Sequence, residues 1–450
     1  MNVRIGVLVL CVVSVALSIG ACKKSMSGAA DWTNYGRTND EQRFSPLQQI
    51  NEQSIGQLGL LWSRELGTTR GLEATPLVSN GIIYTTGEWS TAYALDAKTG
   101  EILWTFDPKV PRALARTICC DVVNRGVALY KGKIFLGTLD RRLIAFDARS
   151  GTPVWDVVTT DQTKPYAITG APRIAKGLVL IGNANGITWA SGIDPKSGRP
   201  IESTTAYNGL QPVLVSPDPG GAHNWYPMAF HSGTGLVYVP AREGVFALHV
   251  PNKHWKYNAK TDNIGMDSRY EGPLLKQSEA VPAPIGKLIA WNPVEQRKIW
   301  EVTDPVLESG GVLATAGNLV FQGRADGMFC AYRATDGRKL WEFNAGTGIM
   351  APPVTYLING TQYLTLVVGW GGSAGLLNIP GHGPIKPGFG RVLTFAIGAN
   401  AKFEGSFFRA PRPTLARYSY EFVLGDRTRR LTPLHGALFL LPWLRCHIGF

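Results

Sequence analysis

Two adjacent cysteines, followed closely by an arginine, are the residues of this sequence best suited to chemistry. Cys119 and Cys120 stand next to each other, and Arg125 follows in the same segment. Neighbouring cysteines can close only a strained eight-membered disulfide ring, and strain of this kind tends to mark a functional site. The alternative is a pair of buried free thiols with Arg125 on the surface.

A hairpin pattern repeats along the chain and predicts the elements that would position this segment. In its first full copy, Asp96, Thr99 and Gly100 form a short turn that leads into a strand ending near Trp104. Gly100 supplies the positive φ that such a turn needs, and the two polar side chains can hydrogen-bond the turn backbone. The strands that end in this way carry Trp62, Trp104, Trp155, Trp300 and Trp341.

The spacing of these tryptophans predicts the fold class. It is 42 residues (62 to 104), 51 (104 to 155) and 41 (300 to 341). About 40–50 residues form one four-stranded blade of a β-propeller. A β-sandwich with coincidental spacing is the alternative, and a turn and ring repeated this often disfavours it. We therefore predict an all-β fold of four-stranded blades around an axis.

The composition fits a protein with many tight turns and a large core. The 450 residues include 52 Gly and 13 Trp, and 44% are hydrophobic, which is ample for tight turns and a large core. The net charge is +12, but no basic face is interleaved with aromatic residues, so nucleic acid is not an expected partner. Cys330 lies in an apolar run, and we expect a buried strand thiol there.

The N-terminus is a targeting segment. Arg4 precedes the apolar run Ile5–Ile19, and Ile19-Gly20-Ala21-Cys22 resembles the end of a bacterial lipoprotein signal. We expect a signal peptide over residues 1–21, lipidation of Cys22 and a tether over 22–30. An ordinary secretory signal cut nearby is the alternative. Either way the mature protein lies outside the cytoplasm, and we expect the periplasm, with the lipid as its membrane anchor.

The segments around these features are similar to one known family. Trp32–Gly36, Gln42–Leu47 and Gly369–Gly372 resemble the pyrroloquinoline quinone (PQQ)-dependent alcohol dehydrogenases, the methanol/ethanol family of quinoprotein propellers. The resemblance covers about residues 31–397. It implies a propeller of eight blades, oxidation of alcohols with PQQ and calcium, and a separate cytochrome c that takes the electrons.

The resemblance also implies a set of cofactor-binding residues. It implies a disulfide between Cys119 and Cys120 that lies against one face of the quinone. It implies further PQQ contacts from Glu73, Arg125, Thr169, Asn224 and Trp225. Taken alone, Glu73 would suit a turn, Thr169 an ordinary strand, and an Asn-Trp pair in a Gly-rich loop is more often packing than ligand.

The resemblance breaks at Asn183–Ile187. The intervening part of the family chain would carry the calcium-binding Glu and Asn, the catalytic Asp, a PQQ-bonding Lys and a stacking Trp. We therefore expect no catalytic Asp, no calcium ligands, and five or six blades instead of eight. Weak matches at Asp194–Gly198 and Ala247–Trp255 could keep the repeat period, so this expectation rests on the motif comparison.

The tail, residues 398–450, carries no copy of the hairpin pattern. It has eight Lys or Arg and three Asp or Glu, and we expect it to be poorly structured. A basic arm for a membrane surface or partner is the alternative. Covalent haem c needs Cys-x-x-Cys-His, and Cys446-His447 is only its second half, so no haem c is expected.

Two functions are compatible with these features. The first is a periplasmic PQQ-dependent alcohol dehydrogenase that is catalytically impaired, because it lacks the calcium ligands and the catalytic Asp. The second is a non-enzymatic propeller lipoprotein, similar to the scaffold of the outer-membrane β-barrel assembly machinery. The lipoprotein signal favours the second function. The vicinal cysteines favour the first, because a scaffold has no use for a strained disulfide.

Overall fold

The computed structural model describes residues 31–116, 118, 121–162, 166–175, 178–181, 192–193, 200–201, 213–215, 220–243, 247–249, 252, 254, 256, 285–372 and 388–403. The junction Asn183–Ile187, Cys119, Cys120, the signal and tether, and the tail beyond residue 403 lie outside these residues. None of the helices in the described part is long and apolar enough to span a membrane.

Five sheets of at least four strands make up most of the described chain. The first two, in chain order, are β3 (Leu77–Ser79), β4 (Ile82–Thr86), β5 (Ala92–Asp96) and β6 (Ile102–Phe106), then β7 (Ala128–Tyr130), β8 (Lys133–Gly137), β9 (Arg142–Asp147) and β10 (Pro153–Val158). The third is β16 (Ala229–His231), β17 (Leu236–Glu243), β19 (Ile285–Asn292) and β20 (Arg297–Asp304). The fourth is β21 (Ser309–Thr315), β22 (Leu319–Arg324), β23 (Met328–Arg333) and β24 (Lys339–Asn344), with β1 (Phe44–Ser45) parallel to β21. The fifth is β25 (Val354–Ile358), β26 (Thr361–Val368), β27 (Arg391–Ile397) and β2 (Leu58–Glu65).

Shorter elements complete the described chain. Three two-stranded pairs are β11 (Arg173–Ala175) with β12 (Leu178–Leu180), β13 (Gly192–Ile193) with β14 (Pro200–Ile201), and β15 (Val213–Val215) with β18 (Ala247–His249). Three 3-10 helices are η1 (Ile55–Gln57), η2 (Glu88–Ser90) and η3 (Arg112–Arg116).

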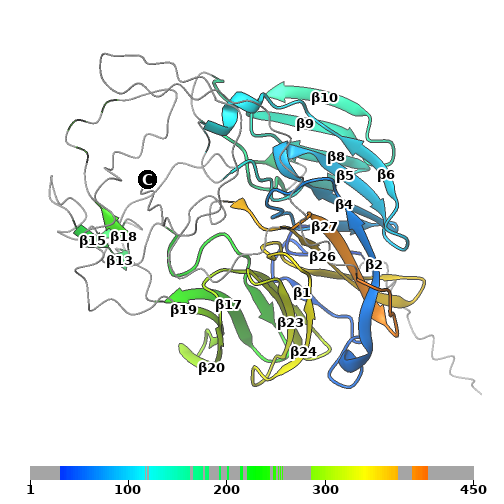
Figure 1. Cartoon of the computed structure of the whole chain (residues 1–450), viewed down its shortest axis with the longest axis vertical. Coiled ribbons are helices and arrows are strands. Elements are labelled where there is room, and N and C mark those ends of the chain that lie inside the picture. The colour runs from blue at the N-terminus through cyan, green and yellow to red at the C-terminus, as the bar shows by residue number, and fades with distance from the viewer. Residues whose placement is uncertain are drawn as a thin grey trace, which may run out of the picture.

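The large sheets follow one another in an arc (Figure 1). The sheet of β7–β10 lies next to that of β3–β6, and the arc continues through β2, β26 and β27 to the sheets that contain β23 and β19. Antiparallel pairing of β2 with β27, from Leu58 opposite Ile397 to Glu65 opposite Arg391, completes the fifth sheet. Strands from the two ends of the described chain therefore share one sheet, as the blue and orange ribbons show.

Several of the repeated tryptophans join neighbouring sheets. The Trp104 indole nitrogen donates a hydrogen bond to the Ala148 carbonyl at 3.0 Å, and that of Trp300 donates to the Ala334 carbonyl at 3.0 Å. The Trp104 ring lies over Gly151, whose φ is +70°. A Cβ atom at this position would lie only 2.8 Å from the ring. The turn glycine therefore provides both the backbone conformation and the space for the neighbouring ring.

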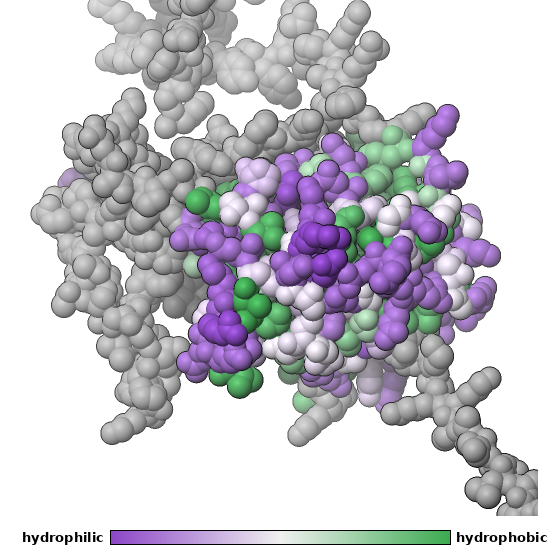
Figure 2. All heavy atoms as spheres, turned by 90° about the horizontal axis from the view of Figure 1, so that it is seen from below, coloured by the Kyte–Doolittle hydropathy of each residue, from purple (hydrophilic) through white to green (hydrophobic). Residues whose placement is uncertain are grey.

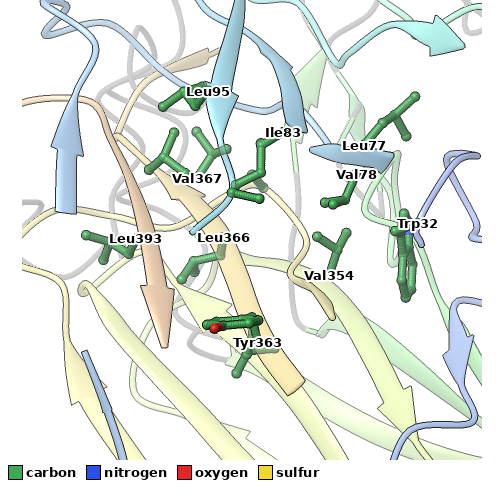
Figure 3. Packing of buried hydrophobic residues seen from close by; sticks show 14 of the residues in the cluster. Trp32, Leu77, Val78, Ile83, Leu95, Val354, Tyr363, Leu366, Val367 and Leu393 are labelled. Carbon is green, nitrogen blue, oxygen red and sulfur yellow. The ribbon is translucent and has the colours of Figure 1, made fainter. Parts of the chain in front are cut away.

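Apolar side chains from neighbouring sheets form the core. Figure 3 shows Ile83 and Leu95 of one sheet beside Leu366 and Val367 of the next, and all four are almost fully buried. On the face shown in Figure 2, hydrophilic side chains cover most of the described surface and apolar patches are separate. The last strand of the second sheet differs, since β10 is exposed along its length and Trp155 is 36% exposed.

The predicted all-β propeller of four-stranded blades is confirmed, and Cys330 is a buried free thiol on β23 as predicted. The total of five or six blades stays a prediction, because the chain around the junction lies outside the described residues.

Candidate functional site

The predicted cofactor-binding residues in the described part of the chain each lie before the first strand of a sheet. The first strands β3 and β21 are buried along their length, whereas the fourth strands β6 and β24 are largely exposed, so the first strands face the inside of the ring. Glu73 lies just before β3, Arg125 before β7, Thr169 before β11, and Asn224 and Trp225 before β16. Segments that lead into the innermost strands of a propeller meet at one end of its axis.

Arg125 is the centre of the group. Its Nη2 atom lies 2.9 Å from Glu73 Oε2, and its Nη1 donates a hydrogen bond to Thr169 Oγ1 at 2.8 Å. The guanidinium carbon lies 4.4 Å from the centroid of the Trp225 ring, a cation–π contact. The structure thus brings four of the predicted residues together around one side chain.

Backbone hydrogen bonds hold the three loops in register. The amide of Arg125 donates to the Thr169 carbonyl at 2.9 Å, and the amide of Thr75 donates to the Arg125 carbonyl at 3.3 Å. The loops before β3, β7 and β11 are therefore fixed to one another, and so are the side chains that they carry.

The Glu73–Arg125 pair is withdrawn from water. The Glu73 side chain is 3% exposed and that of Arg125 is 15% exposed. Burial raises the pKa of the Glu73 carboxyl, and the Arg125 charge opposes that rise. A buried carboxylate is stable only while its cation stays in place, so the pair holds a guanidinium at the inner end of the ring.

Asn224 has a local role in this structure. Its Oδ1 accepts a hydrogen bond from the Trp225 amide at 2.8 Å, and the residue is exposed. It therefore shapes the turn that presents the Trp225 ring.

Three residues that the sequence analysis missed extend the group. The Tyr226 hydroxyl donates a hydrogen bond to Glu308 Oε2, and Glu308 Oε1 lies 3.4 Å from Arg242 Nε. The Tyr226 ring lies 4.5 Å from the Trp225 ring, measured between centroids. Glu308 stands directly before β21, as Glu73 stands just before β3, so a comparison of acidic residues across the repeats could have found it.

A glycine segment forms the wall beside Glu73. Gly372 has a φ of +71°, and a Cβ atom there would lie 2.1 Å from Glu73 Oε1. Trp370, two residues earlier, packs in one cluster with Tyr226 and Met350. Backbone therefore approaches the carboxylate where a side chain would collide with it.

The described chain holds other features outside the direct contacts of Arg125, although the Asp121 charge also helps to raise the pKa of Glu73. Asp121, the neighbour of the two cysteines, pairs with Arg70 at 2.7 Å. A cavity of about 600 Å³ is lined by Tyr35, Glu41 and Arg173 among others, and by none of the predicted site residues. No group of three or more His, Cys, Asp or Glu among the described residues is placed to hold a metal ion.

The donor set fits one edge of a planar anion such as PQQ. Arg125 Nε has no hydrogen-bond partner in the described part of the chain, so this guanidinium retains a free donor. Thr169 adds a hydroxyl, and Trp225 adds a flat ring. Guanidinium groups and aromatic faces are common binders of carboxylates and conjugated rings.

Comparisons with known proteins show which family this chain resembles. The family described as glucose/ethanol/alcohol dehydrogenase, PQQ β-propeller domain, matches residues 32–198 and 196–364. The quinohemoprotein alcohol dehydrogenase ADH IIB of Pseudomonas putida is 31% identical, covering 92% of this chain and 86% of the relative. The 1-butanol dehydrogenase (cytochrome c) of Thauera butanivorans is 30% identical, with 84% and 80% covered.

Solved structures show the same architecture. That of quinohemoprotein alcohol dehydrogenase ADHIIG from Pseudomonas putida HK5 matches with a TM-score of 0.76 at 30% identity, covering 86% of this chain and 83% of the other. The enzyme from Comamonas testosteroni matches with a TM-score of 0.74 at 29% identity, with 84% and 82% covered.

The alignment with ADH IIB spans 604 positions, more than the 450 residues of this chain, so part of the relative has no counterpart here. The family match covers most of the chain, and the relatives reach 30% identity over most of their length. The chain therefore belongs to the family of PQQ-dependent, or quinoprotein, alcohol dehydrogenases.

Proposed function

We propose that this chain binds PQQ at the Arg125 group and retains the alcohol oxidation of its family only in impaired form. The carrying observation is that Arg125 contacts Glu73, Thr169 and Trp225 at once, at the end of the ring where the innermost strands begin. Relatives named as quinohemoprotein alcohol dehydrogenases support the cofactor class.

Each residue of the group would have a distinct task. Arg125 would pair with a carboxylate of the cofactor, while Glu73 and Thr169 keep its guanidinium in place. Trp225 would present its ring to the conjugated system, and a disulfide between Cys119 and Cys120 would cover one face. When bound, PQQ supplies a quinone carbonyl that accepts a hydride from the alcohol.

The proposed impairment rests on the expected absence of one part of the family chain at Asn183–Ile187. In the family that part carries calcium ligands and the catalytic Asp, and calcium polarises the reacting carbonyl. Removing a general base typically costs about 10²–10⁴-fold in rate. The long alignment with ADH IIB, which exceeds the length of this chain, supports such a loss.

The test is reconstitution of the purified chain with PQQ, with and without calcium. PQQ should quench tryptophan fluorescence, and Arg125→Gln should abolish the effect, with Arg297→Gln on the exposed face of β20 as the matched control. Turnover of a primary alcohol with an artificial electron acceptor should stay far below the typical enzyme range of about 1–10³ per second. Calcium-dependent turnover within that range would refute the impairment, and quenching unaffected by Arg125→Gln would refute the site.

The cellular setting is part of the same proposal. The chain would be carried to the periplasm, lipidated at Cys22 and served by a separate cytochrome c, and the name of the Thauera relative supports a cytochrome acceptor. Cys22→Ser should move the protein from the membrane fraction to the soluble fraction. A protein that stays in the soluble fraction before the substitution would contradict the lipid anchor.

A further inference from the structure

Glu308 is a buried carboxylate beside the Arg125 group that the proposed function does not use. Its side chain is 4% exposed, and it stands immediately before β21. Because Glu73, Arg125, Thr169 and Trp225 also stand just before the first strand of a sheet, the topology places Glu308 at the same end of the ring.

Two contacts fix this carboxylate. The Tyr226 hydroxyl donates a hydrogen bond to Glu308 Oε2. Arg242 Nε lies 3.4 Å from Glu308 Oε1, and the Arg242 side chain is 7% exposed. The buried charge is thus compensated, and one of its oxygens is committed to the tyrosine. Hydrogen bonds to a charged acceptor are stronger than those between neutral groups, so the Tyr226 ring is held firmly.

The contacts continue from Tyr226 to Arg125. The centroids of the Tyr226 and Trp225 rings lie 4.5 Å apart, and the ring planes are tilted by 40°. The Arg125 guanidinium carbon lies over the Trp225 ring, 4.4 Å from its centroid. Trp225 is only half-buried, so its orientation depends on these two neighbours and on the Asn224 turn.

We infer that Glu308 is a positioning residue of the proposed PQQ site: it holds the Tyr226 hydroxyl and thereby sets the plane of Trp225 against Arg125. The inference rests on the proposed function for its biological meaning. Its geometric content, the dependence of Trp225 on Glu308, can be measured without cofactor.

The first measurement is the accessibility of Trp225. Each variant is compared with the same variant that also carries Trp225→Phe. The difference between their fluorescence signals gives the acrylamide quenching of Trp225 alone. Tyr226→Phe removes only the hydroxyl, and Glu308→Ala removes the acceptor; both should raise the quenching constant of Trp225 about twofold. Glu308→Gln keeps an oxygen acceptor for the tyrosine and should stay close to the unsubstituted chain. Glu342→Ala, on the exposed strand β24, is the control for loss of a glutamate.

The second measurement is PQQ binding by the same proteins. Tyr226→Phe and Glu308→Ala should weaken it about tenfold, the usual order for a lost charge-assisted hydrogen bond, and Glu308→Gln should restore most of the affinity. A purely structural role would lower the melting temperature without separating Glu308→Gln from Glu308→Ala in these two readouts.

The outcomes separate the two proposals. If PQQ binds independently of Arg125, the proposed function fails, and the Trp225 accessibility still decides the role of Glu308. If Trp225 has the same accessibility in the unsubstituted chain, in Tyr226→Phe and in Glu308→Ala, the positioning role is overturned. Should Glu308→Ala fail to fold, Tyr226→Phe, which keeps the ring volume, decides alone.

Discussion

At the scale of single residues, two buried carboxylates near the site each depend on a neighbouring cation. Glu73 depends on Arg125 and Glu308 on Arg242, and all four side chains are largely withdrawn from water. Removal of one partner leaves a buried charge without compensation, which costs more than the pair itself contributes.

Arg125→Gln should therefore destabilise the protein strongly. We expect a loss of about 3–5 kcal/mol in the free energy of unfolding by urea at pH 7, because Glu73 remains buried and loses its cation. The pKa of Glu73 is already raised, and a raised folded-state pKa gives stability that is present at low pH and lost as the pH rises. The deficit should accordingly be smaller at pH 4.5 than at pH 8.

Two further variants check this prediction. Combining Arg125→Gln with Glu73→Gln should recover most of the lost stability. Arg297→Gln, which breaks an exposed pair with Glu295, should change it by less than about 1 kcal/mol. A deficit in Arg125→Gln that does not vary with pH would show that the Glu73 charge is not its cause.

Asp304 gives a second pH-dependent prediction. Burial raises the pKa of this carboxyl to about 7, and the charge of Arg324, 3.7 Å away, opposes that rise only in part. The unfolded chain loses this proton near pH 4 and the folded chain near pH 7, so Asp304 lowers stability progressively across that window. Relative to the unsubstituted chain, Asp304→Asn should gain up to about 4 kcal/mol between pH 4 and pH 8 in urea titrations. A constant difference between the two proteins would contradict the assignment.

At the scale of elements, the turn glycine of several sheets, Gly100, Gly151 and Gly337, lies against the tryptophan ring of the preceding sheet. Gly100, between β5 and β6, has a φ of +73°, and a Cβ atom there would lie 2.4 Å from the Trp62 ring. Gly81, between β3 and β4 of the same sheet, has a φ of +76° and open space around it.

The two glycines form a matched pair of substitutions. Gly81→Ala should cost about 1 kcal/mol, which is the conformational penalty alone. Gly100→Ala carries the same penalty and in addition displaces the Trp62 ring. We expect a further loss of stability of about 1–3 kcal/mol, the usual cost of overpacking a core. Thermal and urea unfolding measure the difference, and equal losses would show that the Trp62 contact contributes nothing to the joint between sheets.

At the scale of the whole molecule, β2 and β27 close the fifth sheet. Residues far apart in the sequence meet there. Beyond β27, the Phe403 ring packs on Phe343 of β24 in the fourth sheet, with 5.3 Å between the ring centroids. The described chain ends at this residue, after the last strand of the predicted propeller.

Two truncations test the closure and the predicted tail together. A chain that ends at Phe403 should unfold cooperatively at the same urea midpoint as the full chain. A chain that ends at Phe389 lacks β27, leaves β2 and β26 without their partner, and should lose cooperative unfolding. A clear loss of stability on removing only residues 404–450 would contradict the prediction that the tail lies outside the propeller.

Local patterns determined a large part of this architecture. The turn of Asp96 and Gly100 is a property of one short segment, and the tryptophans repeat that segment at the period of a propeller blade. For the same reason Cys330, within an apolar strand, was predictable as a buried thiol.

Only the tertiary structure decided which side chains meet. Glu73, Arg125 and Trp225 were singled out by resemblance, but their pairing around one guanidinium depends on how the loops before β3, β7 and β16 converge. The position of Glu308 before β21 matches that of Glu73 before β3, but its contacts with Tyr226 and Arg242 come from the segment of another sheet and could not be predicted. Hairpins follow from the backbone preferences of a few residues, whereas contacts between loops depend on the curvature of the whole ring, and no short segment encodes that curvature.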